Sequence, residues 1–371
     1  MDALKRVLVH KASPIQHLCT RCVKNLSGYS QLPHYQRFCT APPCFQRKRY
    51  CTAVDSVPEL EATALRGTRL ASRSLILLGG RDAGDLLQGL MTNDVDLLRE
   101  DEEGLPAIFS MFLNKQGRIL YDVMCYRWGG GQEGGPLAYV LECDSTISPE
   151  LQKHLKFYRI RKKVDIASLD SEYHVWSVFS EEDETPAPQA SSDSYLCHSH
   201  KVADPRIKGL GQRIILPHGN SLSRVAEVSE QDYQTHRYQW GVAEGVNELP
   251  PGESLPLEAN LALMNGVSFT KGCYLGQELT ARTHHTGVIR KRIMPVQLLR
   301  NESSLFPPGS TIKTNEGKNV GKLRCHLHQN GLALLRTALI GDKLWLSQEG
   351  TEDTELVARR PSWWPEEIKN K

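Results

Sequence analysis

The chain has 371 residues, of which 40% are hydrophobic and 24% are charged, a composition typical of soluble globular proteins. This length accommodates two or three domains, and no apolar run approaches the ~18 residues that a membrane-spanning helix needs. The formal net charge of +2 is unevenly distributed: residues 1–51 hold nine basic side chains and one acidic one, which leaves 36 basic and 42 acidic residues in the remainder. We therefore expect no membrane insertion and no general affinity for nucleic acid.

Residues 1–51 are typical of a mitochondrial transit peptide. The segment is rich in arginine and hydroxyl-bearing residues, and three of its apolar residues share one face of a helix that ends at Pro14. The five cysteines beyond this segment are scattered and odd in number, which argues against a disulfide framework and fits a reducing compartment. We predict a location in the mitochondrial matrix and removal of the leader between Arg37 and Thr52; a disordered basic tail is the alternative.

Beyond a linker near residues 54–58, short strands alternate with helices. Apolar patterning predicts strands over 74–78, 107–113, 119–126, 137–142, 164–167 and 175–179, and helices over 83–90, 149–157 and 229–240. An acidic stretch near 181–205, rich in proline, alanine and serine, predicts a disordered insertion or a solvated loop. From residue 290 to 360, short β-rich runs separated by turns predict a small barrel. The fold class is therefore α+β with a β-rich C-terminal domain.

The most informative stretch is the octet at residues 271–278. Two glycines, Gly272 and Gly276, bracket a turn, because glycine permits sharp bends and close backbone approach. Cys273 lies close to Lys271 near the start of a short helix, a setting that favours the thiolate over an ordinary thiol of pKa about 8.5. No histidine or aspartate at a motif-fixed distance completes a nucleophilic set. A turn with an incidental cysteine is the alternative.

Three sequence blocks carry a family resemblance. They cover residues 86–94, 114–122 and 256–287, the last of which contains the octet. In this order they resemble the YgfZ-type branch of the glycine-cleavage T-protein (aminomethyltransferase-like) family, whose members bind tetrahydrofolate. The resemblance implies a three-lobed folate-binding fold, with two lobes over 58–289 and the C-terminal barrel as the third. Together with the leader, it implies an assembly factor that acts late in making mitochondrial [4Fe–4S] clusters.

The resemblance also implies which residues bind folate. A pteridine presents a guanidine-like edge, from which a carboxylate can accept two parallel hydrogen bonds. Glu258 is the candidate for this role, and a solvated loop glutamate is the alternative. Arg118 could hold a carboxylate in its planar fork, or form an ordinary surface salt bridge. Asn114 and Glu278 are the other predicted folate contacts.

Asp122 ends the second block. In the aminomethyltransferases the comparable segment carries two adjacent aspartates, one of which assists the folate chemistry, whereas Tyr121 stands in the first position here. Loss of one carboxylate removes a candidate acid/base group, which argues against aminomethyl transfer. Asp122, Lys271 and Cys273 are the candidates for catalytic residues, and whether the protein is an enzyme stays open.

Cys273 cannot hold an iron–sulfur cluster alone. Clusters require several thiolates, and no second cysteine lies within the octet, so we predict no metal site wholly inside the chain. Cys273 could instead ligate a transient cluster shared with a partner, or act as a redox-sensitive thiol. The basic run at 153–163 could bind a folate polyglutamate tail or an acidic partner. The alternative is a solvated face with the apolar residues Phe157, Tyr158 and Ile160 turned inward.

The leading hypothesis is a tetrahydrofolate-binding assembly factor. Its predicted partners are A-type iron–sulfur carrier proteins and [4Fe–4S] client apoproteins of the aconitase and lipoate-synthase types. The alternative from another class is a folate-dependent one-carbon or aminomethyl transferase. A third is a scaffold that keeps the fold without the ligand.

Overall fold

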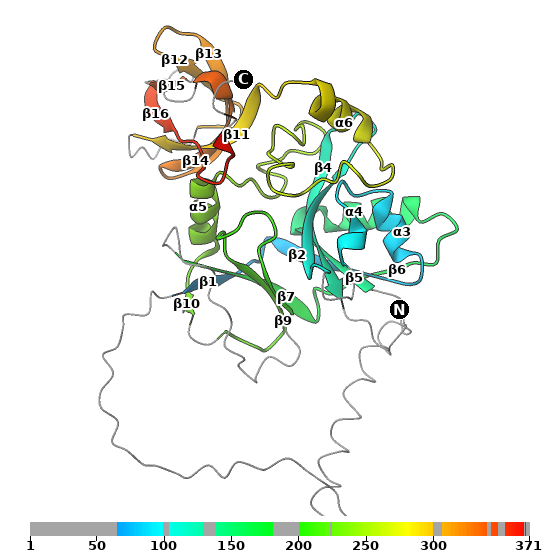
Figure 1. Cartoon of the computed structure of the whole chain (residues 1–371). Helices are drawn as coiled ribbons and strands as arrows, with labels where there is room; N and C mark the ends of the chain where they lie inside the picture. The colour runs from blue at the N-terminus through cyan, green and yellow to red at the C-terminus, as the bar shows by residue number, and fades with distance from the viewer. Residues whose placement is uncertain are drawn as a thin grey trace, which may run out of the picture. The chain divides into compact units, whose positions relative to one another are not determined.

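The computed structural model describes residues 65–98, 104–128, 138–180, 200–222, 225–299, 306–339, 343–347, 353–366 and 368. These residues belong to one compact unit that begins at Ala64 (Figure 1). The predicted transit peptide and residues 181–199 of the predicted insertion lie outside the described residues. Across the described ranges, no helix has the length and apolar character needed to cross a bilayer.

The first sheet has five antiparallel strands and carries an apolar core. In spatial order they are β3 (Ala107–Leu113), β4 (Ile119–Trp128), β5 (Ala138–Asp144), β2 (Arg73–Gly79) and β6 (Asp165–Ser168). Helices α3 (Ala83–Gln88) and α4 (Ser148–Tyr158), with the 3-10 turns η1 (Val95–Leu98) and η2 (Ser145–Ile147), accompany it. Leu87 of α3 and Leu151 and Leu155 of α4 pack into the same core as alternate residues of the strands. Cys125 and Cys143 are buried in it.

The end of α4 differs from the prediction. Leu151 and Leu155 lie one turn apart and are buried, so the side chain two positions beyond Leu155 leaves the helix on the opposite side. Phe157 and Ile160 are accordingly exposed, by 67% and 70%. The expectation of inward-turned side chains was wrong for Phe157 and Ile160, whereas Tyr158 is partly buried and packs against the core.

The second sheet also has five strands. They are β10 (Ala226–Glu227), β1 (Arg66–Arg69), β7 (Tyr173–Phe179), β9 (Gln212–Pro217) and β8 (His200–Ala203). Only β1 and β10 pair in parallel among these strands. The prediction of an insertion near 181–205 was wrong at the C-terminal end of that range, because residues 200–203 form β8, which pairs with β9, and Val202 is buried. The buried Asp204, which follows β8, binds Arg206 and fixes this end of the segment.

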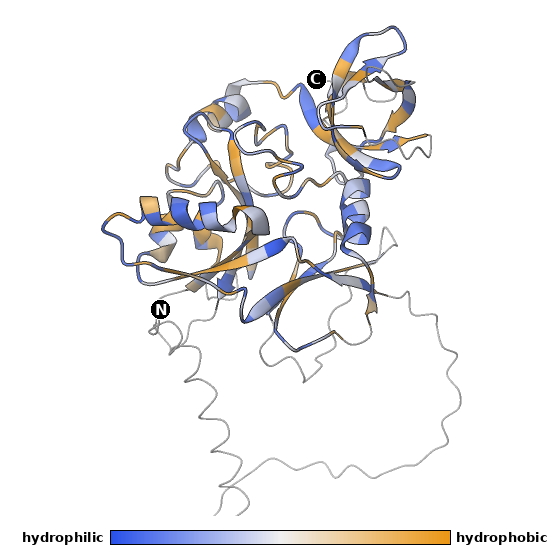
Figure 2. Ribbon diagram, turned by 180° about the vertical axis from the view of Figure 1, so that it is seen from behind, coloured by the Kyte–Doolittle hydropathy of each residue, from blue (hydrophilic) through white to orange (hydrophobic). Residues whose placement is uncertain are grey.

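Helix α5 (Glu230–Trp240) follows the second sheet. Ser229 caps its first turn and forms a reciprocal capping box with Asp232, and Gly241 ends it in the left-handed conformation. Figure 2 shows α5 as mostly hydrophilic, yet Tyr233 and Arg237 are buried. A polar helix of this kind can be buried only where its charged groups find partners.

The C-terminal domain is a closed antiparallel barrel. Its order is β11 (Lys291–Leu298), β14 (Asn330–Arg336), β13 (Asn319–Leu327), β12 (Thr311–Thr314), β15 (Leu344–Ser347) and β16 (Thr354–Ala358), with η3 (Thr337–Leu339) after β14. Alternate residues such as Met294, Val296 and Leu298 fill the interior. The predicted fold class, α+β with a C-terminal barrel, is confirmed. The polar strand β16 was not predicted, although it closes the barrel between β15 and β11.

Candidate functional site

The three sequence blocks pack against one another. The segment that precedes the octet runs beside the connection from α3 to η1, where Ser268 N donates to the carbonyl oxygen of Thr92 (3.1 Å). The Thr92 hydroxyl donates to the carbonyl oxygen of Gly266 (2.7 Å). Within the octet, Leu275 N donates to the carbonyl oxygen of Gly89 (3.0 Å). The octet is therefore held as a fixed edge along the first block.

Lys271 strengthens this attachment. Its ammonium donates to the carbonyl oxygens of Met91 (2.9 Å) and Asn93 (2.7 Å) and lies 5.3 Å from the centre of the Tyr274 ring. Burial lowers the pKa of Lys271 to about 8, against the opposing effect of nearby aspartates. The cation that the sequence placed beside Cys273 is thus directed at backbone carbonyls of the first block.

The second block locks the other end of the octet. Gly276, which precedes α6 (Gln277–Thr286), has φ +81°, and a Cβ there would overlap the carbonyl oxygen of Asn114. Gly117 has φ +76°, and its Cβ would lie 3.0 Å from the carbonyl oxygen of Gly276. Both positions combine a left-handed backbone with close backbone contact, and only glycine meets both conditions.

Between these anchors the octet is open to solvent. A Cβ on Gly272 would meet nothing within 4 Å. Cys273 is exposed, whereas Cys125 and Cys143 are buried and Cys325 is intermediate. Among the residues that the structure describes, no group of three or more His, Cys, Asp or Glu side chains could hold a metal ion. Within the described ranges, no side chains therefore join Cys273 to complete a set of iron ligands.

Helix α6 leads from the octet to a cavity of about 550 Å³. Its residues Leu279, Thr283 and Thr286 share one face because they are four and three positions apart. The lining residues are Leu255, Pro256, Leu257, Glu258, Leu279, Thr280, Thr283, Thr286, Val288, Ile289, Arg290 and Lys291. The cavity is thus lined by apolar side chains, by threonine hydroxyls and by a small group of charged side chains.

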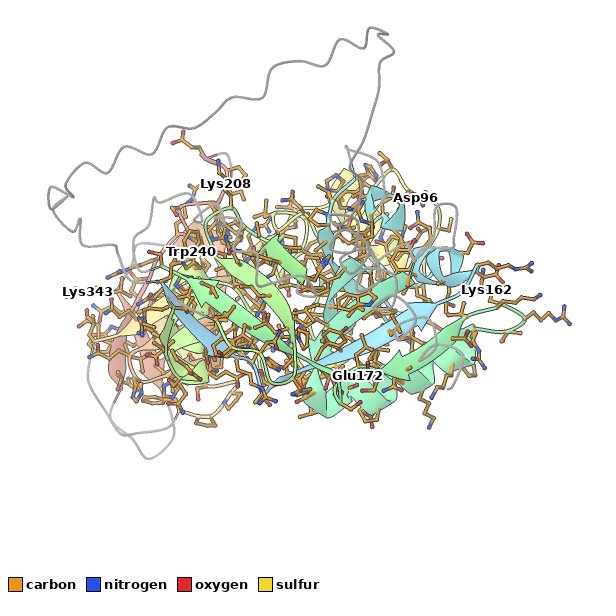
Figure 3. All side chains as sticks on the ribbon, turned by 90° about the horizontal axis from the view of Figure 1, so that it is seen from below. Asp96, Lys162, Glu172, Lys208, Trp240 and Lys343 are labelled. Carbon is orange, nitrogen blue, oxygen red and sulfur yellow. The ribbon has the colours of Figure 1, made fainter. Side chains whose placement is uncertain are left out.

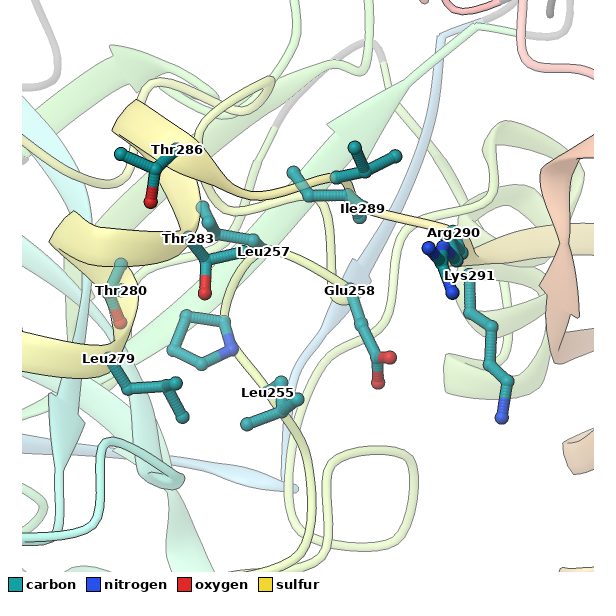
Figure 4. A pocket seen from close by; sticks show the side chains of 12 residues that line it. Leu255, Leu257, Glu258, Leu279, Thr280, Thr283, Thr286, Ile289, Arg290 and Lys291 are labelled. Atoms are coloured by element: carbon teal, nitrogen blue, oxygen red, sulfur yellow. The ribbon is translucent and has the colours of Figure 1, made fainter. Parts of the chain in front are cut away.

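Glu258 is the acidic group of this cavity. Figure 4 shows its carboxylate between Leu255 and Lys291, and the threonines of α6 on the side of the pocket away from Lys291. Burial raises its pKa, although the positive charges of Lys291, Arg324 and Arg118 act to lower it. Within the described part of the chain, the carboxylate forms no hydrogen bond or ion pair. A half-buried carboxylate without a protein partner can accept hydrogen bonds from a ligand.

The other predicted folate contacts do not line this cavity. Arg118 is exposed and donates from Nη1 to the carbonyl oxygen of Glu253 (2.5 Å). The Asn114 side chain accepts hydrogen bonds from the backbone N–H groups of Gln116 (3.0 Å) and Arg118 (2.9 Å), which closes the turn between β3 and β4. Glu278 is exposed in the first turn of α6. Only Glu258 of the predicted set faces the cavity.

Asp122 does not line the cavity either, because it is buried in a separate network of charges. Its Oδ1 accepts from Gly245 N (3.0 Å), and its Oδ2 lies 3.4 Å from Arg73 Nη1. Burial raises the pKa of Asp122, while the Arg73 guanidinium acts to lower it. The network comprises Arg73, Arg206, Arg213, Arg237, Asp122, Asp204, Glu142, Glu244 and Glu248.

Glu244 is the centre of that network. Its Oε2 lies 2.5 Å from Arg213 Nη2 and 2.7 Å from Arg206 Nη1, and it accepts from the Tyr233 hydroxyl (3.1 Å). Burial alone would raise its pKa, but these arginines together with Arg237 lower it well below the usual range. Asp122 therefore belongs to a buried network of opposite charges, where it is enclosed by guanidinium and backbone groups.

Sequence reasoning missed most residues that line the cavity. Thr283 and Thr286 follow the octet at helical spacing, which is the signal that could have found them. Lys291 is the first residue of β11, so the sequence analysis assigned it to the barrel. Both Lys291 and its neighbour Arg290 nevertheless line the cavity. No local signal connects these residues to Glu258, because the cavity joins segments that are separate in the sequence.

Comparisons with known proteins agree with this arrangement. The profile described as CAF17, C-terminal beta-barrel domain, matches residues 290–366. The aminomethyltransferase T of the glycine cleavage system from Bartonella henselae superposes with a TM-score of 0.60 at 14% identity, over 81% of this chain and 87% of that one. At this identity the likeness shows the fold alone, and it confirms the predicted aminomethyltransferase-like fold.

Three relatives are named as assembly factors. The "Iron-sulfur cluster assembly factor IBA57, mitochondrial" of Homo sapiens is 43% identical over 305 residues, 80% of this chain and 85% of the human protein. The Mus musculus protein of the same name is 42% identical, over 81% and 86%. The homolog in Mycosarcoma maydis, also named mitochondrial, is 33% identical, over 85% and 88%. Because such identity extends over most of its length, the chain belongs to the IBA57 family of iron–sulfur cluster assembly factors.

Proposed function

We propose that this protein acts in the mitochondrial matrix in the late steps of [4Fe–4S] cluster assembly. Cys273 supplies one thiolate to a cluster that is shared, in passing, with an A-type carrier protein. The cluster is cargo for client apoproteins of the aconitase and lipoate-synthase types. In this account, tetrahydrofolate binds in the cavity beside Glu258.

One observation carries the role of Cys273: an exposed thiol on a turn that is anchored at both ends. Lys271 fixes the turn to the first block and Gly276 fixes it to the second. The thiol must lose its proton to ligate iron, and a cluster needs several ligands. A rigid, open, single-thiol turn suits a ligand set that two proteins complete together, because the partner can approach without displacing protein groups.

The folate proposal rests on the unpaired Glu258 carboxylate. The ring N–H and amino groups of a pteridine would donate to it in parallel, and the apolar walls would cover the ring faces. Arg290 and Lys291, at the same cavity, would attract the glutamyl carboxylates of the ligand. Bound tetrahydrofolate would supply a reduced one-carbon carrier. No residue of the buried network around Asp122 is required for this binding.

Calorimetric titration of the purified protein with tetrahydrofolate tests the cavity. We expect Glu258→Gln to weaken binding at least tenfold, because the amide supplies a donor where the pteridine edge also donates, and a mismatched buried pair costs about 1–3 kcal/mol. Glu278→Gln, at an exposed position outside the cavity, is the matched control and should bind as the wild type does. Equal affinity of wild type and Glu258→Gln would reject the site.

The competing function is a folate-dependent one-carbon or aminomethyl transferase. The aminomethyltransferase-like fold favours it, whereas Tyr121 in place of an aspartate and the enclosure of Asp122 count against it. One assay distinguishes the two functions: the protein is mixed with tetrahydrofolate and an S-aminomethyl thiol, whose carbon would become the methylene group as ammonia and the free thiol leave. More than one methylene-tetrahydrofolate formed per protein molecule would favour the enzyme.

A further inference from the structure

A basic and apolar surface follows helix α4. We call it the α4 tip and define it as residues 156–163. Phe157 and Ile160, three positions apart, are 67% and 70% exposed and are the two most exposed large apolar side chains in the described part of the chain. Lys156, Arg159 and Lys163 are also exposed around them. Figure 3 shows Lys162 at the outer edge of the molecule, on the loop that leaves α4.

The backbone of the α4 tip has a defined conformation. Arg161 adopts a left-handed backbone with φ 60°, and Lys162 N donates to the carbonyl oxygen of Arg159 (2.7 Å). Arg159 Nη1 donates to the carbonyl oxygen of Val164 (3.1 Å), and Lys163 N donates to Asp82 Oδ2 (2.6 Å). The exposed apolar side chains are therefore presented by an ordered turn at the end of a helix.

The charges of this surface are strongly one-sided. Six cationic residues line a hollow of about 750 Å³ beside the tip, against one acidic residue, and Asp82, which pairs with Arg81 (3.2 Å), is a second acid at its edge. They are Arg81, Lys156, Arg159, Arg161, Lys162 and Lys163, with Asp165 as the acid. Residues 52–371 as a whole carry more acidic than basic side chains. A negatively charged surface would therefore attract this face and repel much of the remaining molecule, which fixes one orientation of approach.

The composition favours a lipid surface over a protein partner. The cores of protein interfaces are depleted in lysine, whereas three of the six cations here are lysines. Phe157 and Ile160 project from the turn between long cationic side chains, the arrangement with which peripheral proteins enter the boundary between headgroups and acyl chains. Each lysine or arginine near an anionic bilayer strengthens binding further.

We propose that the α4 tip docks this protein on the surface of a bilayer that contains anionic phospholipids. Phe157 and Ile160 insert at the headgroup boundary, and the cations contact lipid phosphates. The binding is peripheral and reversible, and it involves no membrane-spanning segment.

Vesicle co-sedimentation of the full chain tests the proposal. Vesicles of phosphatidylcholine alone are compared with vesicles that contain an equal part of phosphatidylglycerol. The wild-type protein should sediment with the anionic vesicles and should not sediment with the neutral vesicles. Lys156→Glu with Lys163→Glu should weaken binding by at least about 25-fold, from roughly fivefold for each cation lost. Phe157→Ser with Ile160→Ser should weaken it at least about tenfold at unchanged charge.

Lys318→Glu with Lys322→Glu is the matched control, because both lysines are exposed on the barrel and the change in net charge is the same. This pair should bind as the wild type does, and every variant carries the same N-terminal segment. Absence of wild-type binding to the anionic vesicles would overturn the proposal, and so would an equal loss in the control pair. The tip would instead bind a protein partner if two results came together. Vesicle binding would be weakened by Lys156→Glu with Lys163→Glu but not by the serine pair, and Phe157→Ser would abolish capture of an acidic protein.

Discussion

At the scale of single residues, Glu258 is the group on which the folate proposal rests. Its carboxylate is half-buried among apolar side chains and has no protein partner within the described residues, although positive side chains lie nearby. A charge held in this way costs stability in the empty protein. Functional positions commonly carry such a cost, and the proposal that Glu258 binds tetrahydrofolate would account for it.

We expect Glu258→Gln to raise the melting temperature of the ligand-free protein at pH 7. The folded-state pKa of Glu258 lies above its unfolded value of about 4.3, so its charge costs stability above the folded pKa and costs nothing below about pH 4.3. The difference between variant and wild type should therefore close as the pH falls through this window. Calorimetric melting from pH 4 to 7.5 measures it; a variant that is less stable than the wild type at pH 7 would contradict the account.

At the scale of elements, the two glycines of the octet have different roles. Gly276 is required by its left-handed backbone and by the contact with the second block, whereas Gly272 is bounded by open space. The sequence predicts a turn at both glycines and does not distinguish them. Neither the φ angle of Gly276 nor its contact with Asn114 can be inferred from local spacing. The open position is next to Cys273, on the side where we propose that a partner docks.

Gly276→Ala should lower the free energy of unfolding by about 2 kcal/mol or more, since it combines a strained dihedral with a backbone overlap. Gly272→Ala should change it by less than about 0.5 kcal/mol, because nothing lies within 4 Å of the added methyl group. Urea denaturation of the two variants measures the contrast. Similar values for both would show that the octet is not locked against the second block.

The elements themselves were predicted where local pattern is strong. The bounds of β3 match the prediction, and α5 begins one residue after the start of the helix predicted over 229–240. β1, β9 and β10 were missed, and β8 was assigned to an insertion. These strands are short or end in proline, and long-range pairing stabilises them, which a local window does not detect.

At the scale of the whole described unit, the buried charge network is the feature that sequence reasoning did not anticipate. It joins β2, β4 and β5 of the first sheet to β9 of the second and to α5, through Arg73, Arg213 and Arg237. Buried pairs are costly to break because one partner is left charged and unpaired. Asp122 could be predicted from its sequence block. Its enclosure could not be predicted, because the residues that enclose it are distant in the sequence.

Glu244→Gln should destabilise the protein by about 3–5 kcal/mol at pH 7, because it leaves buried guanidinium groups without their carboxylate. The folded pKa of Glu244 is depressed, so its contribution is present above about pH 4.3 and is lost as the pH falls through the folded value. The gap between wild type and variant should therefore narrow in acid. Urea midpoints across this range provide the measurement, with the exposed Glu316→Gln as a control expected to stay within about 0.5 kcal/mol.

The central claim concerns Cys273, and it is tested most directly by reconstituting cluster assembly with an A-type carrier, iron and sulfide. Absorbance in the thiolate-to-iron region follows the shared species, and Cys325→Ser serves as the control because that cysteine lies in the barrel. We expect a shared cluster with wild type and Cys325→Ser and its loss with Cys273→Ser, while all three keep the same melting temperature. A shared cluster that forms equally well with Cys273→Ser would contradict the account.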